Sequence, residues 1–359
     1  MKILQRYVLQ ELWMPFLLSF GTLSFIFMAG YLVRAANFII GRGIPLFDTL
    51  YVLLLALPEM ISYTAPTSVL TAVLIVFGGL SQNNEIRGMK ASGVYPVHIM
   101  VPAFLVSLAL SFVMFVFNDQ IATNASFEIR RTTKQMLIKH PAALIEPGRF
   151  VKLSDTIVFL AKKRNGNQMR DVVAYETESE DKPIRTIVAE RGEITSDKEH
   201  GELKIRLYDG SVSDSEDASV QSIQFKTYEF PTLGQEDIRQ MRKKPRDLSL
   251  AELLMKAGSS KSGRDKNEAW SWFHQRIAFS FGCFIFAFIG VPIAILVRRG
   301  EMVLSFGISM AATSVYYILF VGAKTLALQM YTPPIIAYWI PNLLFFAFGF
   351  KLLRRSLVV

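Results

Sequence analysis

Six long apolar runs dominate this sequence of 359 residues. A helix needs about 20 apolar residues to cross the hydrocarbon layer of a bilayer, which is about 30 Å thick. The first run is too long for the apolar core of a cleaved signal peptide, and no small-residue cleavage site precedes a polar start. We therefore predict six transmembrane helices, in residues 12–33, 50–78, 97–117, 270–297, 303–328 and 335–353.

The formal net charge of +9 belongs to the ends of these runs. Residues 119–268 contain 26 Lys/Arg and 25 Asp/Glu, so almost all of the excess lies elsewhere. Most of the other basic residues fall at the two termini and in the second and fourth connections, which share one side if six helices alternate. Short loops rich in Lys and Arg stay in the cytoplasm, so we expect both termini inside and residues 119–268 outside. This distribution excludes nucleic-acid binding as an explanation of the basicity. The basic residues at the two termini and in these two connections are Lys2, Arg6, Arg87, Lys90, Arg298, Arg299, Lys351, Arg354 and Arg355.

The polar middle of the chain alternates apolar and polar residues with a period of two. Short β-branched segments separated by Gly, Asn, Asp and Ser favour an antiparallel sandwich or jelly roll. We expect tight turns at Asn165-Gly166 and Asp209-Gly210. The expected strands are 150–153, 156–160, 172–176, 186–190, 203–208 and 222–228.

Helical segments are expected on both sides of this β-rich region. The third apolar run continues as a polar helix over about 118–139, and a short helix over 249–256 precedes a Ser/Gly/Lys linker at 258–266. The predicted organisation is therefore 1–118 with three spans, 119–268 as an outer domain, and 269–359 with three more spans. The single cysteine, Cys283, lies in the fourth run, so the outer domain depends on its core and not on disulfides.

The sequence contains no pattern for covalent chemistry. The glycine-containing string 258–263 is followed by Arg264 and Asp265, which does not match a phosphate-binding loop. The four histidines are scattered without metal-ligand spacing. We therefore predict no catalytic residue, no metal and no cofactor.

Four charged residues lie where charge is expensive, in the outer half of the predicted bilayer or at its edge. A charge inside a span usually faces a cavity or a partner. Arg34, Arg276 and Lys324 at similar depth would form a site for a phosphorylated lipid. The alternative for Arg34 and Lys324 is snorkelling to the interface, and the alternative for Glu59 is an internal salt bridge.

The second run and the connection after it carry two further features. Pro58 and Pro66 predict a kinked span with loosened backbone hydrogen bonds. Residues 81–93 predict a short helix on the cytoplasmic surface, capped near Ser81 and stopped by Gly93. This helix could insert into a partner's groove with Glu85 facing a basic residue, or it could be a solvated interfacial helix with Ile86 and Met89 exposed.

These features together resemble the paired permeases LptF and LptG of the lipopolysaccharide exporter. The resemblance is carried by Leu57-Pro58-Glu59-Met60, by Ala65-Pro66 and by the string from Glu85 to Gly93. The segment Leu32-Val33-Arg34 and the Pro-Glu-Met string favour LptF. The order of three spans, an outer domain and three spans is similar over essentially the whole chain.

The resemblance implies a subunit that binds no cofactor itself and leaves ATP to its partners. The implied partners are the paralogous permease, a cytoplasmic LptB ATPase dimer, membrane-anchored LptC and then LptA, with lipopolysaccharide as cargo. The implied location is the bacterial inner membrane, and the implied outer domain is a periplasmic jelly roll.

Individual residues take implied roles from the same resemblance. Glu85, with Arg87 and Gly93, matches the family's ATPase-coupling helix. Arg34 and Lys324 match basic residues that face the lipid cavity, and Arg276 matches the arginine after the tryptophan-containing start of the fourth span. Pro58, Glu59 and Pro66 would be structural or gating positions within the membrane.

Two other classes of protein are alternatives to this interpretation. A lipoprotein-releasing or mechanotransmitting permease has four spans with its outer domain after the first, whereas here that domain follows the third. A receptor with an outer β sensor domain would be expected to carry a cytoplasmic output domain, and none is seen in the sequence.

Overall fold

The computed structural model describes residues 2–41, 44–139, 148, 150–152, 157–179, 182–197, 202–214, 221–230, 240–297 and 301–358. The chain forms two compact units. The first comprises Met1–Ala29, Ala56–Phe127 and Lys243–Val359, and is helical. The second comprises Gly30–Leu55 and Glu128–Arg242, and contains the β-sheet.

Among the described residues, six helical stretches are long and apolar enough to cross a membrane, in agreement with the six predicted spans. The third stretch continues through a π-helical turn, η2, into the polar helix α5, as expected. The last part of the expected linker is helical, because α8 already begins at Gly263. The helices are α1 (Lys2–Ala36), η1 (Asn37–Gly41), α2 (Leu46–Gln82), α3 (Glu85–Ala91), α4 (Val97–Val116), η2 (Phe117–Ala122), α5 (Thr123–Lys139), η4 (Pro245–Asp247), α7 (Leu250–Ser259), α8 (Gly263–Ser280), α9 (Gly282–Val297), α10 (Met302–Leu328) and α11 (Pro334–Val358).

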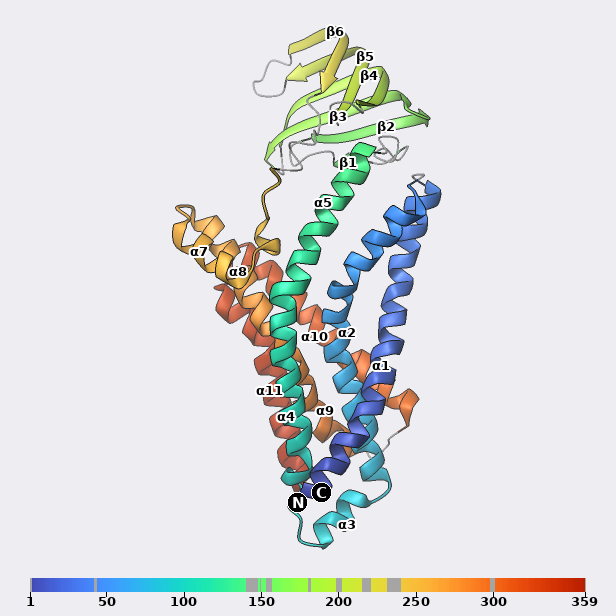
Figure 1. Cartoon of the computed structure of the whole chain (residues 1–359). Coiled ribbons are helices and arrows are strands. Elements are labelled where there is room, and N and C mark those ends of the chain that lie inside the picture. The colour runs from blue at the N-terminus through green and yellow to red at the C-terminus, as the bar shows by residue number, and fades with distance from the viewer. Residues whose placement is uncertain are drawn as a thin grey trace. The chain divides into compact units, whose positions relative to one another are not determined.

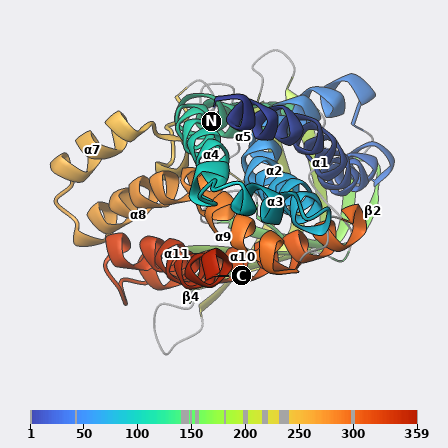
Figure 2. The ribbon, with the colours of Figure 1, turned by 90° about the horizontal axis from the view of Figure 1, so that it is seen from below.

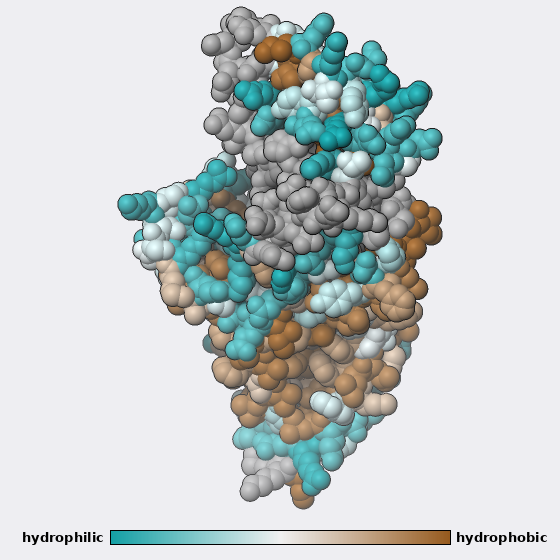
Figure 3. Space-filling view, turned by 45° about the horizontal axis from the view of Figure 1, so that its top comes forward, coloured by the Kyte–Doolittle hydropathy of each residue, from teal (hydrophilic) through white to brown (hydrophobic). Residues whose placement is uncertain are grey.

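Helix α9 forms the centre of the helical unit (Figure 2). Most of its residues are buried, and it packs against α4 and α11. Gly290 allows α2 to come close, because a Cβ at that position would lie 2.8 Å from Leu70 Cδ1. The outer face carries a band of apolar side chains with polar residues at one end (Figure 3). This pattern is typical of a bundle whose surroundings are also apolar.

Helix α2 runs without interruption through Pro58 and Pro66. Proline lacks the N–H that would bond the carbonyl four residues earlier, so neighbouring groups must supply other hydrogen bonds. Pro66 leaves the Ser62 carbonyl without its usual helical donor, and at the next residue the Tyr317 hydroxyl donates to the Tyr63 carbonyl at 2.9 Å. The Ser62 hydroxyl lies 2.6 Å from Asn118 Oδ1. Side chains of other helices thus contact α2 where its own ladder is weakened.

The six strands form one antiparallel sheet in which each strand pairs with its neighbour in sequence. An antiparallel β-domain inserted between the third and fourth spans is therefore confirmed. The pairings between described strands are those of a meander, and the two-sheet jelly roll stays a prediction. The strands are β1 (Phe150–Lys152), β2 (Ile157–Asn165), β3 (Gln168–Ser179), β4 (Lys182–Asp197), β5 (Glu202–Asp214) and β6 (Gln221–Phe230).

One of the two expected turns is confirmed and the other is wrong. Gly166, with φ 61°, lies in the loop between β2 and β3, directly after Asn165. Asp209-Gly210 instead lies inside β5. Asp209 does adopt a left-handed φ of 53°, but the strand continues beyond it. The local turn signal is used for a bend, not for a reversal.

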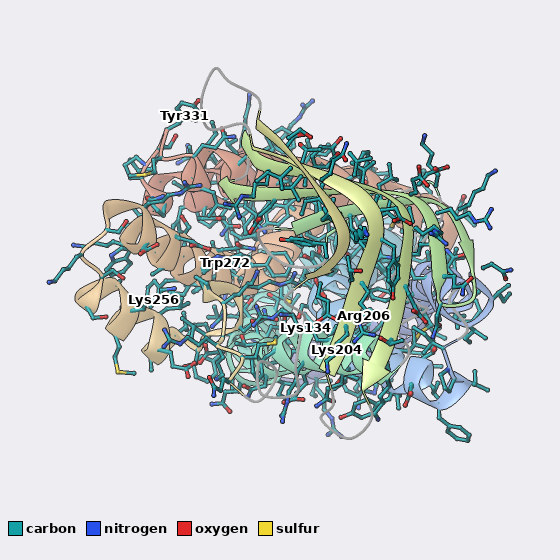
Figure 4. The ribbon with its side chains drawn as sticks, turned by 90° about the horizontal axis from the view of Figure 1, so that it is seen from above. Lys134, Lys204, Arg206, Lys256, Trp272 and Tyr331 are labelled. Atoms are coloured by element: carbon teal, nitrogen blue, oxygen red, sulfur yellow. The ribbon has the colours of Figure 1, made fainter. Side chains whose placement is uncertain are left out.

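The sheet is bent along one line that crosses five strands. In β3 the buried positions change from Met169 to Val172, and in β5 the buried Leu207 is followed by Val212, which is half-buried against the same core, so the inward-facing set shifts by one residue. Asp171 and Asp209 have positive φ at these shifts. The strands curve strongly along their length (Figure 4). We call this row the fold line; it consists of Lys162, Asp171, Glu190, Asp209 and Lys226, none of which is in a paired register.

Candidate functional site

The short helix α3 follows α2 after only two residues. It begins at Glu85, so the expected start at Ser81 is wrong: Ser81 lies in the last turn of α2, where its hydroxyl donates to the Ile295 carbonyl at 3.1 Å. Asn84, with φ 56°, turns the chain between the two helices. The sequence missed this break because Asn tolerates the left-handed conformation without a glycine signal.

Helix α3 ends at Ala91, and Gly93 stops it as predicted. The Gly93 N–H donates to the Lys90 carbonyl at 3.0 Å, and the Val94 N–H donates to the Met89 carbonyl at 3.0 Å. These two bonds, with φ 84° at Gly93, form a Schellman motif. A side chain at this φ would be strained, so glycine fixes the direction in which the chain leaves α3.

Contacts with other helices hold α3 onto the bundle. The Tyr7 hydroxyl of α1 donates to Glu85 Oε2 at 3.3 Å, and Asn83 Nδ2 donates to Glu85 Oε1 at 3.4 Å. On the opposite side Lys90 Nζ donates to the Leu357 carbonyl of α11 at 3.4 Å. Ile86 is only 5% exposed, which corrects the expectation that it faces solvent. A displacement of α3 would therefore act directly on α1, α2 and α11.

A small apolar cavity lies beside α3. Its volume is about 460 Å³, and Tyr7 stands at its border with the side chain that bonds Glu85. The helix lies at the same end of the helical unit as the two ends of the chain (Figure 1). The cavity is lined by Ile3, Leu4, Gln5, Tyr7, Met89, Ser92, Val94 and His98.

A second group of polar side chains surrounds Arg276 in α8. Arg276 Nη1 donates to Asp119 Oδ1 at 2.8 Å and to the Leu248 carbonyl at 2.8 Å, while Nη2 donates to the Arg246 carbonyl at 3.3 Å. Asp119 Oδ1 also accepts the Leu250 N–H at 2.8 Å. The Arg276 side chain is 8% exposed. The pair thus holds residues 246–250, where the chain returns to the helical unit after the β-domain.

Glu59 and Lys324 lie next to this clamp. Arg246 Nη2 donates to Glu59 Oε1 at 2.8 Å, so the internal salt bridge proposed for Glu59 is present. Lys324 Nζ lies 4.5 Å from the centroid of the Trp272 ring, and Glu59 and Arg246 are its electrostatic neighbours. Trp272 is labelled in Figure 4. Its indole Nε1 is buried without a hydrogen-bond partner among the described residues.

The predicted lipid residues are therefore in different surroundings. Lys324 is half-buried and stacked on an aromatic ring, whereas Arg276 donates three hydrogen bonds to protein oxygens. Arg34 belongs to the other compact unit, where its guanidinium lies 5.1 Å from the ring of Tyr31. Lipid binding by these three residues stays a prediction.

Sequence reasoning missed three contributors to these sites. Tyr7, Asp119 and Arg246 each bond a predicted residue across at least 78 positions of sequence. The one available signal was the charge of Asp119 directly after an apolar run. The described residues contain no group of three or more His, Cys, Asp or Glu side chains that could hold a metal ion.

Comparison with known proteins adds two findings. Residues 6–355 match the family model for the lipopolysaccharide export system permease LptF/LptG. The chain is also 22% identical over 147 residues to an uncharacterised protein of Rickettsia prowazekii (strain Madrid E). That similarity covers 41% of this chain and 41% of the relative's length.

Proposed function

This chain belongs to the LptF/LptG family, and we propose that it is a permease subunit that extracts lipopolysaccharide from the inner membrane and passes it to a periplasmic bridge. ATP would be hydrolysed by a cytoplasmic ATPase dimer, and the paralogous permease would complete the membrane unit. LptC and LptA would receive the lipid. The observation that carries the proposal is the match over residues 6–355 together with six apolar helical stretches.

The geometry of α3 supports coupling to an ATPase. A partner that binds α3 would grip a helix whose ends are fixed by Asn84 and Gly93. Since Glu85 is bonded to Tyr7, and Lys90 to Leu357, motion of α3 is transmitted to both ends of the chain within the helical unit. The carboxylate of Glu85 keeps further lone pairs for a basic group of the partner.

The group around Lys324 supports contact with a phosphorylated headgroup. Lys324 supplies a cation, and Trp272 Nε1, which has no partner among the described residues, supplies a hydrogen-bond donor. Arg246 holds a second positive charge beside them, balanced by Glu59. A phosphate oxygen would satisfy the indole donor and gain charge-assisted bonds at the same place.

Reconstitution tests the proposal. The chain would be co-expressed with the paralogous permease, the ATPase and the periplasmic bridge, and the complex would be placed in vesicles containing lipopolysaccharide. We expect release of the lipid to the bridge protein only with ATP. A complex whose ATPase cannot hydrolyse ATP is the control. Release that does not need ATP, or a complex that forms and hydrolyses ATP without moving lipid, would contradict the proposal.

A further inference from the structure

A groove in the β-sheet is lined by an excess of positive charge. Its volume is about 990 Å³, and it lies next to the fold line. Lys162, Lys163, Arg170 and Arg191 contribute cations, and Glu193 contributes the one carboxylate of the lining. The other lining residues are Asn165, Gln168, Met169, Gly192 and Tyr208.

Three of these cations stand in one row across three strands. Lys163 of β2 is directly opposite Arg170 of β3, and Arg170 is directly opposite Arg191 of β4. Opposite residues of an antiparallel pair point to the same face, with Cβ atoms about 4.5–5.5 Å apart, and like charges there destabilise the sheet. We call Lys163, Arg170 and Arg191 the cationic row.

Among the described residues, a carboxylate neutralises the cationic row at one end, at Arg191. Arg191 Nη2 lies 2.6 Å from Asp209 Oδ2. Within the part of the chain that the structure describes, no ion pair involves Lys163 or Arg170, and both side chains are exposed. The next row of the same face is balanced differently, because Arg206 is paired with Glu229. The cationic row therefore holds like charges opposite one another, although the next row of the same face holds opposite charges in a pair.

We propose that this groove binds a phosphate group of the transported glycolipid as the lipid passes the outer domain. The inference rests on the proposed function and adds a binding site to it. A phosphate carries up to two charges and several acceptor oxygens, so it can bridge cations on neighbouring strands. A guanidinium at Arg170 offers paired donors, and Lys163 adds a mobile point charge. Asn165 and Gln168 supply neutral donors at the same edge.

The effect of removing two of these charges on thermal stability distinguishes a binding role of the cationic row from a structural role. If the cationic row were structural, neutral glutamines would weaken the sheet. If it serves a ligand, K163Q/R170Q should leave thermal stability unchanged or raise it, while phosphate binding falls. The matched control K226Q/K261Q removes the same charge from two exposed lysines outside the groove.

The experiment uses the full chain with its partners in nanodiscs. A photo-crosslinker replaces Gln168, and the probes are lipopolysaccharide with its phosphates and the same lipid after enzymatic dephosphorylation. We expect crosslinks to the phosphorylated form to exceed those to the dephosphorylated form about tenfold, which is the factor for one charge-assisted contact. The excess should disappear in K163Q/R170Q and persist in K226Q/K261Q.

The outcomes distinguish the groove from the transport proposal. Pyrophosphate added as a soluble competitor should reduce the crosslinks. Binding of pyrophosphate without phosphate-dependent crosslinks to the lipid would make the groove a free-phosphate site and overturn the inference. Equal crosslinks to both lipids while ATP-driven release is normal would also overturn it, and leave the transport function standing. Loss of ATP-driven release in every complex, the unaltered one included, would instead count against the transport function.

Discussion

Arg276 and Asp119 form a nearly buried ion pair with 2.8 Å between Nη1 and Oδ1. Its oxygen and nitrogen atoms are also the hydrogen-bond partners of the backbone at Leu248 and Leu250. Removing one partner of such a pair leaves an uncompensated charge, which costs about 3–5 kcal/mol. We therefore expect Arg276→Met or Asp119→Leu to lower the thermal stability of the purified protein strongly.

The double variant R276M/D119L is the matched control for this pair. Because it removes both charges together, it should be more stable than either single variant. Limited proteolysis near residues 240–250 should show the same order. Additive effects of the two substitutions would mean that the pair contributes no coupling energy.

Glu85 is expected to contact the ATPase. Glu85→Lys replaces attraction by repulsion, so the ATPase subunits should dissociate from the purified membrane complex. Insertion and folding should be unaffected. Glu301→Lys, which alters an exposed carboxylate before α10, is the control. Co-purification of the ATPase at the normal ratio with Glu85→Lys, together with normal lipid-stimulated hydrolysis, would reject the role.

Arg34 and Lys324 are expected to contact the lipid headgroup. A rim contact contributes about 1 kcal/mol and a desolvated charge-assisted pair about 2–3 kcal/mol, so R34A/K324A should reduce transport far more than either single change. Photo-crosslinkers at 34 and 324 should capture lipopolysaccharide in the assembled complex. Lys351→Ala serves as the control. No crosslinks at either position, with undiminished transport, would favour simple interfacial anchoring.

The start of α7 should be sensitive to acid. The Ser249 backbone N–H, followed by Lys243, lowers the pKa of Glu252 in the folded protein. A lowered folded pKa gives stability that is present above the ordinary value of about 4.3 and lost as pH falls through the folded value. Glu252→Gln should thus speed hydrogen exchange of α7 amides at pH 7, and its effect should disappear only as the pH falls below the folded pKa of Glu252. Lys243→Ala removes the ion pair and keeps the hydrogen bond from the Ser249 N–H to Glu252. If it reduces the protection of α7 amides as much as Glu252→Gln does, a capping role of Glu252 is excluded.

The direction of insertion can be read by labelling. In a Cys283→Ser background, a cysteine at Asn167 of the β2–β3 loop should react with an impermeant thiol reagent added to spheroplasts. A cysteine at Ala91, the last residue of α3, should not react until the membrane is opened. The reverse pattern would place the β-domain in the cytoplasm.

The candidate spans were predictable because the apolar length that crosses the hydrocarbon layer must lie within one continuous segment of the sequence. About 20 apolar residues suffice to identify one, whatever its neighbours are. The β-domain followed from alternation, and the short helix α3 followed from its residues and its glycine stop. These are local signals that the fold does not override.

The clamp at Arg276 was not predictable in the same way. Its partners lie 157 positions away at Asp119 and 28 positions away at Leu248, and no local pattern selects them. At Asp209-Gly210 the local signal was real, because Asp209 does have a positive φ, but pairing with β4 and β6 kept the strand continuous. Tertiary pairing decided what the turn residues would do.

The fold line also determines how the β-domain tolerates mutation. In an ordinary strand the positions that are sensitive to mutation are every second residue, all odd-numbered or all even-numbered, from one end to the other. Here an odd-numbered set, Ile205 and Leu207, gives way to an even-numbered set, Gly210 and Val212, within β5. Substitutions should therefore be tolerated at even-numbered positions in the first half of β5 and at odd-numbered positions in the second half. Insertion or deletion of one residue inside either half of the strand would turn the apolar side chains of that half toward solvent. The same change at Asp209 would leave each half in phase with itself and alter only the register between the two halves.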